Sequence, residues 1–280
     1  MSHGTFLQRL TEGTRWAWLA EGYRAALPED LEATVMDLDA RDRYHAKQGR
    51  STARVRFDSP RGELSVYLKR HERLPWSARL RALVDPGGKH SPAAAEWAHL
   101  ERARALGIAV PDAVAVGERI GPWGRLSSFL MVAELTGAVE LNEILPSLAK
   151  TMPAPEFAAW KRSILAEMAG MVAKLHQSYV FHKDLYLCHF FLDTTPRARP
   201  GSRLTLIDLH RLGEHRWSAP RWRRKDLGQL LYSTYDVAGI DDRDRLRFWR
   251  LYRRAVGLRR PRRQAGMIRA KAERYRAHNR

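Results

Sequence analysis

The sequence predicts an α+β protein with two unequal lobes, a small strand-rich lobe followed by a larger helical one. Alternating apolar residues around position 60 indicate a hairpin, and apolar residues at three- and four-residue steps over 156–177 indicate a long helix. The chain beyond position 226 also has mostly helical character. With 280 residues, the protein is long enough for two lobes that share a cleft.

The expected domain boundaries follow from these changes of pattern. Residues 1–45 carry aromatic and apolar residues at irregular helical spacing, which predicts a partly helical N-terminal extension. Residues 46–134 are expected to form the small lobe. Residues 135–280 are expected to form the large lobe, with a basic helical tail.

In the small lobe, apolar residues alternate from Ser51, pass the turn Arg61-Gly62 and alternate again up to Lys69, which predicts a hairpin. A basic, turn-rich surface loop is expected over 70–91.

The next element is predicted to be a helix that begins near Pro92 and ends at Gly107, because proline fits a first turn and glycine ends helices. Short strands are expected at 113–116 and 128–134. In the large lobe, residues 190–192 and 204–207 flank a turn-rich stretch and predict a second hairpin.

The overall charge predicts an anionic partner. The sequence has 49 Lys and Arg residues against 31 Asp and Glu residues, a formal net charge of +18, and a hydrophobic content of 44% that is typical of globular proteins. Nucleic acid, an acidic membrane face, a phosphorylated lipid and a nucleotide would all satisfy this charge.

The single cysteine, Cys188, excludes an internal disulfide and favours a reducing compartment, so we expect a cytoplasmic protein. The N-terminus lacks the pattern of a signal peptide, and no run approaches the roughly 20 apolar residues of a spanning helix. Any membrane contact is therefore expected to be peripheral.

Two motifs in the large lobe carry chemistry. His182-Lys183-Asp184-Leu185 follows the long helix, and Leu206-Ile207-Asp208 follows the second hairpin. Together they resemble the catalytic core of the protein kinase-like fold. More narrowly, HKDLYLCHFFL followed by LIDLHRL resembles the bacterial lipopolysaccharide kinases, which phosphorylate heptose or Kdo sugars of the inner core. The match is strongest over 175–250 and weaker over 50–140.

The resemblance implies roles for the large-lobe residues. Asp184 matches the carboxylate that accepts the proton of the attacking hydroxyl, and Asp208 matches the aspartate that ties Mg²⁺ to the nucleotide phosphates. His189 stands where most kinases have the asparagine of a second metal site. Its alternative is a buried histidine that a backbone carbonyl satisfies. Lys183 and Cys188 are expected to be structural.

In the small lobe, Lys69 at a strand end resembles the phosphate-binding lysine, and Glu96 on the next helix resembles its partner. Two solvated surface charges are the alternative. Gly49 and Arg50 lie where a glycine-rich loop would cover phosphate, although protein kinases have three glycines there. Position alone assigns Glu134 and Leu135 to the adenine edge.

Asp226 resembles the buried aspartate that ties the following helix to the catalytic loop. The arginines of the run DDRDRLRFWRLYRR either face an acidic acceptor or lipid surface, or form a solvated face.

The resemblance therefore implies an ATP- and Mg²⁺-dependent kinase of a sugar hydroxyl on an anionic glycolipid, at the cytoplasmic face of the inner membrane. One alternative is a small-molecule or protein kinase of the same fold, since the fold does not determine the acceptor. Another is a catalytically idle binding scaffold. No recognised nucleic-acid-binding motif is present, so nucleic acid is not expected as a partner.

Overall fold

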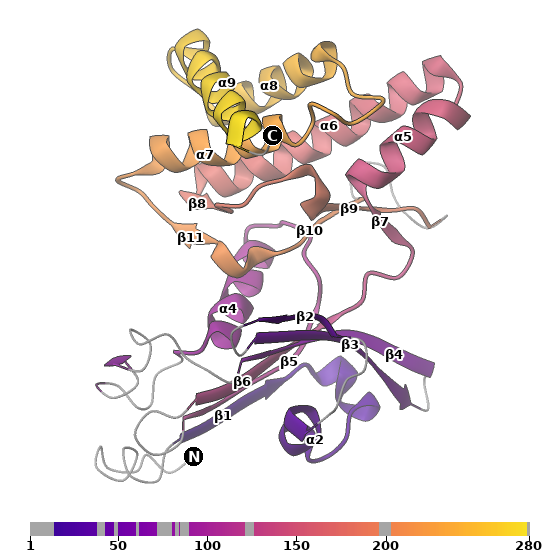
Figure 1. Cartoon of the computed structure of the whole chain (residues 1–280), viewed down its shortest axis with the longest axis vertical. Helices are drawn as coiled ribbons and strands as arrows, with labels where there is room; N and C mark the ends of the chain where they lie inside the picture. The colour runs from indigo at the N-terminus through magenta and orange to yellow at the C-terminus, as the bar shows by residue number, and fades with distance from the viewer. Residues whose placement is uncertain are drawn as a thin grey trace. The chain divides into compact units, whose positions relative to one another are not determined.

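The structure is a computed structural model. It describes residues 14–37, 43–47, 50–59, 62–71, 80–81, 84, 90–120, 126–195 and 203–278. The chain divides into two compact units, the first formed by Met1–Glu101 and Pro111–Leu135 and the second by Arg102–Val110 and Thr136–Arg280. The first unit is built on an antiparallel sheet and the second is mainly helical (Figure 1), which confirms the expected α+β class.

The first unit contains a six-stranded sheet of order β1-β5-β6-β4-β3-β2, and every neighbouring pair is antiparallel. The predicted hairpin is confirmed, because Lys69 pairs with Thr52 across it and with Leu130 on the other side. At its turn Gly62 has φ 111°, which side-chain-bearing residues rarely adopt. The strands are β1 Thr14–Leu19, β2 Arg43–Lys47, β3 Arg50–Ser59, β4 Gly62–His71, β5 Ala113–Ile120 and β6 Leu126–Ala133.

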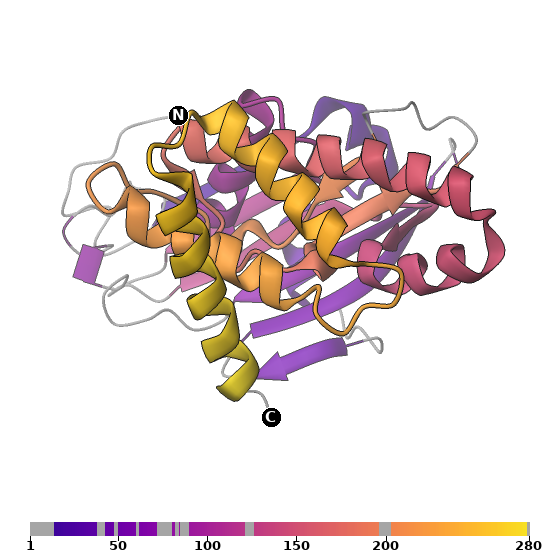
Figure 2. The same cartoon turned by 90° about the horizontal axis from the view of Figure 1, so that it is seen from above.

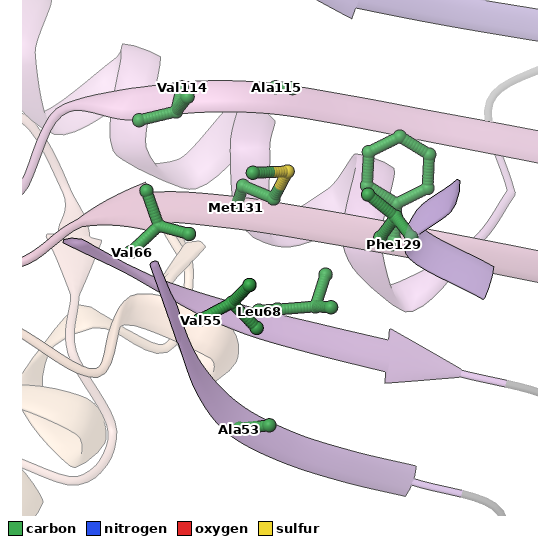
Figure 3. Close-up of a cluster of buried hydrophobic side chains, with 9 residues drawn as sticks. Ala53, Val55, Val66, Leu68, Val114, Ala115, Phe129 and Met131 are labelled. Atoms are coloured by element: carbon green, nitrogen blue, oxygen red, sulfur yellow. The ribbon is translucent and has the colours of Figure 1, made fainter. Parts of the chain in front are cut away.

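The apolar alternation of these strands places one set of side chains on a single face of the sheet (Figure 3). Val66, Leu68 and Met131 are fully buried there. Val35, from the short helix α2 (Leu31–Asp37), belongs to the same cluster and is also fully buried. The alternation read from the sequence therefore builds the core of this unit.

Residues 14–19 form a strand that the irregular aromatic spacing did not predict. β1 pairs with β5, and the rings of Trp16 and Trp18 each lie 5.4 Å from that of Trp97. Residues two apart on a strand share a face, so both tryptophans point at the same neighbour. Trp97 lies on α4 (Pro92–Ala105), which confirms the helix expected there. A 3-10 helix, η1 (Glu21–Ala26), follows β1.

The second unit is organised by helices. α8 packs on α6 and α9 packs on α7, and Figure 2 shows α9 crossing α7. The hairpin of β9 and β10 is confirmed and joins β7 in a three-stranded sheet. The elements are β7 Ala138–Glu140, α5 Leu141–Thr151, α6 Ala154–Gln177, β8 Val180–Phe181, η3 Leu187–His189, β9 Phe190–Asp193, β10 Leu204–Leu206, η4 Leu209–Arg211, β11 Gly213–Glu214, α7 Ala219–Tyr232, α8 Asp242–Val256 and α9 Pro261–His278.

The acidic start and one arginine of α8 have structural contacts. Asp241 caps the helix by accepting from the Asp244 backbone N–H at 2.9 Å. Arg245 donates to the carbonyl and hydroxyl of Thr234, at 2.8 and 3.0 Å, beyond the end of α7. At least this member of the arginine-rich run therefore joins α8 to the segment that follows α7. None of the helices among the described residues is long and apolar enough to cross a membrane.

Candidate active site

The loop that follows β8 is held from below by Asp226, a residue of α7 with no exposed surface. Its carboxylate accepts the backbone N–H groups of His182 at 2.9 Å and Lys183 at 2.8 Å. These contacts hold Lys183 at φ 66°, a conformation that costs free energy for a residue with a side chain. The role expected for Asp226 is thus matched by direct contacts.

A buried histidine also reaches this carboxylate. The Nε2 atom of His176, on α6, lies 3.3 Å from Asp226, and its Nδ1 atom lies 2.7 Å from the hydroxyl of Tyr252. Both contacts are satisfied when Nε2–H donates to the carboxylate and the tyrosine donates to Nδ1. Burial lowers the pKa of His176, which favours this neutral form.

Asp184, the expected proton acceptor, follows directly in the loop. Arg211 donates to its Oδ2 at 2.9 Å, and Gln229 of α7 donates to its Oδ1 at 3.0 Å. Two donors on different oxygens set the orientation of the carboxylate. Sequence reasoning did not single out either donor, although Arg211 stands within the quoted LIDLHRL motif and Gln229 lies one turn after Asp226.

His189 connects the two acidic residues of the site. Its Nδ1 atom lies 2.7 Å from the carbonyl oxygen of Asp184, and its Nε2 atom lies 3.6 Å from Oδ2 of Asp208. A carbonyl only accepts, so Nδ1 must carry the proton. In the neutral ring the lone pair of Nε2 then faces the Asp208 side. The carbonyl contact of the alternative is present at one ring nitrogen, although the ring is half-buried rather than buried, and the other nitrogen faces Asp208.

Asp208 occupies a turn with φ 61°, in the left-handed region. Its Oδ1 accepts from Nδ1 of His210 at 2.6 Å, a partner that sequence reasoning also missed. The preceding carbonyl, that of Ile207, accepts from Nε2 of buried His182 at 3.0 Å. Since burial lowers the pKa of His182, this histidine is a neutral support that ties the two motifs together.

These contacts bring Asp184, His189 and Asp208 together in the second unit. The two rings of His182 and His189 stack with centroids 5.5 Å apart, so the ring of His189 is packed as well as hydrogen-bonded. Among the described residues, no group of three or more His, Cys, Asp or Glu side chains is arranged to hold a metal ion by itself.

The neighbouring side chains of the loop have structural contacts. The ammonium of Lys183 lies 5.3 Å from the ring centroid of Trp222. Cys188 is half-buried, and burial raises the pKa of its thiol, which opposes formation of a nucleophilic thiolate.

In the first unit, the ammonium of Lys69 on β4 lies 2.5 Å from the carboxylate of Glu96 on α4. The side chains are 24% and 8% exposed, which excludes two independent solvated charges. A strand and a helix thus present one cation whose direction is set by a buried carboxylate.

The side chain of Glu134, a residue expected at the adenine edge, forms an ion pair within the first unit. Its carboxylate accepts from Arg54 at 2.7 Å, and its backbone N–H donates to Ser65 at 3.0 Å. Of its backbone groups, the carbonyl has no such bond within the described residues. Leu135 follows it and is half-buried. Gly49 lies outside the described residues, and only the backbone of Arg50 is described, paired with His71.

Comparison with known proteins agrees with the family resemblance of the sequence motifs. The model of the lipopolysaccharide kinase (Kdo/WaaP) family matches residues 83–252. Lipopolysaccharide core heptose(I) kinase WaaP of Pseudomonas aeruginosa is 35% identical over 210 residues, 75% of each chain. The protein of that name from Escherichia coli K12 is 31% identical over 159 residues, 56% of this chain and 58% of the relative.

A solved structure of WaaP in complex with acyl carrier protein has the same fold. It superimposes with a TM-score of 0.68 at 32% sequence identity, and the match covers 92% of this chain and 98% of that one. The expected kinase-like fold is therefore confirmed.

Proposed function

We propose that this chain, which belongs to the lipopolysaccharide kinase (Kdo/WaaP) family and is a kinase, transfers phosphate from ATP to a heptose hydroxyl of the lipopolysaccharide inner core. The choice of heptose follows the names of its relatives. The observation that carries the proposal is the ring of His189, which contacts the backbone carbonyl of Asp184 and faces the carboxylate of Asp208, and so links the two acidic residues that phosphoryl transfer needs.

Asp184 is proposed to orient the acceptor hydroxyl and accept its proton. Arg211 and Gln229 hold the carboxylate from two sides, so its direction is set before the acceptor arrives. The hydroxyl must approach Oδ1 or Oδ2 beside one of these donors, which are therefore positioning residues for the reaction.

Asp208 and His189 are proposed to hold Mg²⁺. The residues present fit this ion: Asp208 supplies the carboxylate oxygen that Mg²⁺ prefers, and Nε2 of His189 faces it with a lone pair at 3.6 Å. Nitrogen is a weaker ligand for this ion. Few protein ligands are needed, because Mg²⁺ in kinases also binds phosphate oxygens and water. When bound, the ion neutralises charge on the transferred phosphate.

For the nucleotide, we propose that Lys69 contacts the phosphates and that Glu96 holds it in place. Gly49 and Arg50 are proposed to cover phosphate, and Glu134 and Leu135 to meet the adenine edge. Because the side chain and N–H of Glu134 are already bonded, only its carbonyl would serve this purpose. Residues 46–134 would form this nucleotide-binding lobe, after an extension over 1–45 and before an acceptor lobe over 135–280.

The acceptor is lipid-linked, so we propose that the protein works at the cytoplasmic face of the inner membrane. Its net charge of +18 would draw it to an anionic leaflet. We also propose a complex with an acyl carrier protein, since a relative of 32% identity forms one. Co-elution with carrier protein, and loss of it in high salt, would support this partner.

The main experiment combines purified protein, ATP, Mg²⁺ and inner-core glycolipid, with mass detection of the phosphorylated product. We expect one added phosphate on a heptose, and no transfer after chelation of the metal. A truncated acceptor that contains Kdo but lacks heptose is the matched control. Equal transfer to that control, or transfer only to small molecules or proteins, would contradict the proposed acceptor.

A further inference from the structure

A strongly basic pocket lies between α7 and α9. Five of its seven lining residues are cations: Arg221, Arg224 and Lys225 from α7, and Lys271 and Arg274 from α9. Met267 and Ala270 complete the lining. Among the described residues that line it, none has a carboxylate, so the pocket gathers positive charge without an internal counter-ion.

One of the cations, Arg224, is held in place by neutral neighbours. Arg224 donates to the carbonyl of Pro220 at 3.0 Å and to the sulfur of Met267 at 3.3 Å. The two helices approach closely at Gly228, where an added Cβ would lie 2.9 Å from Cγ of Lys271. Within the described part of the chain, no ion pair joins a lining cation to a carboxylate.

The pocket adjoins the proposed proton acceptor. Lys225 donates to the carbonyl of Lys183, the residue before Asp184. On α9, Tyr275 follows the lining residue Arg274, and burial, with a smaller contribution from the negative charges of Asp184 and Asp226, raises the pKa of Tyr275 to about 12. Both helices that form the pocket therefore reach the surroundings of Asp184.

Crowded cations repel one another, and a bound oxyanion would relieve this repulsion through charge-assisted hydrogen bonds. We propose that this pocket binds a carboxylate or phosphate group of the acceptor glycolipid and thereby holds the sugar hydroxyl at Asp184. The inference rests on the proposed function and adds a specificity site to it: the kinase would select acceptors that carry an anion beside the phosphorylated sugar.

The test is the double variant Arg221→Gln/Arg274→Gln, which removes one exposed cation from each helix. The matched control is Arg259→Gln/Arg263→Gln. It removes two exposed arginines near the start of α9 that do not line the pocket. Equilibrium binding of labelled inner-core glycolipid and the KM of transfer are measured for both. We expect Kd and KM for the acceptor to rise about tenfold or more in the pocket variant only. The KM for ATP should stay within about twofold.

Two altered acceptors identify the anion: one with phosphates removed, the other with carboxylates reduced to alcohols. The alteration that abolishes the difference between wild type and pocket variant identifies the bound group. Equal acceptor affinity in wild type and pocket variant, an equal loss in the control variant, or a difference that survives both alterations would each overturn the inference. A wild type that binds glycolipid through the pocket but transfers no phosphate would instead contradict the proposed function.

Discussion

Two groups of charged residues, one in each unit, are held by different means. In the first unit, Lys69 is directed by the carboxylate of Glu96. In the second, Asp184 and Asp208 sit on turns that depend on buried Asp226 and on two histidine rings. From this difference we expect that perturbing the lysine has little effect on the fold, whereas the residues that support the carboxylates are also part of the core.

The largest expected effect is on the rate of phosphate transfer, after substitution of Asp184 in the second group. Asp184→Asn keeps the shape of the side chain and an oxygen for Gln229, but loses the proton acceptor, so kcat should fall about a thousandfold. Steady-state phosphorylation measures this, with the melting temperature as a check of folding. Transfer at the wild-type rate would remove Asp184 from the reaction.

The next change tests whether the scaffold of the second group is part of the core. Asp226→Ala leaves two backbone N–H groups and a histidine without their acceptor, so the free energy of unfolding should fall by about 3–5 kcal/mol. Denaturant titration measures it. The control is Asp236→Ala, whose side chain is 84% exposed and should change stability by less than about 0.5 kcal/mol. Similar losses in both would show that Asp226 has no special structural role.

A smaller effect is expected for the first group. Glu96→Gln removes the charge that directs Lys69 and keeps the volume, so kcat/KM should fall about tenfold, with stability nearly unchanged. Its control is Glu63→Gln on β4, where the ion pair with Arg56 is exposed and should have no effect on activity. A large loss of stability in Glu96→Gln would end the distinction between the two groups.

The smallest expected effect is the loss of folding stability at acidic pH. Burial lowers the pKa of His176 in the folded state below the roughly 6.5 of an unfolded chain. Stability is therefore fully present above about pH 6.5 and is lost as pH falls below it, because the unfolded state binds the proton first. The slope should reach about 1.4 kcal/mol per pH unit for this histidine, and His176→Gln should reduce it. An unchanged slope would show that His176 does not contribute.

Local patterns were sufficient for several main elements of the fold. The hairpin ending at Lys69, the helix over 156–177 and the second hairpin were all predicted, since each repeats apolar residues with the period of its own structure. The strand at 14–19 was missed, because Trp16 and Trp18 pack against Trp97, which lies far along the chain. A long-range ring contact leaves no local periodic signal.

The active-site motifs were also local, and so the residues for which roles are proposed could be named. Their partners were not all predictable: Arg211, His210 and Gln229 are ordinary polar residues until the turns at Lys183 and Asp208 bring them within hydrogen-bond distance.

By itself, the sequence determined the α+β class, the main hairpins and helices and the family, because these depend on residue types at short, regular spacings. Only the tertiary structure decided which nitrogen of His189 faces Asp208, which contacts orient Asp184, and that five cations from two helices share one pocket. Those properties depend on atoms that packing brings together. The distance between two atoms in the folded chain cannot be read from the number of residues between them in the sequence.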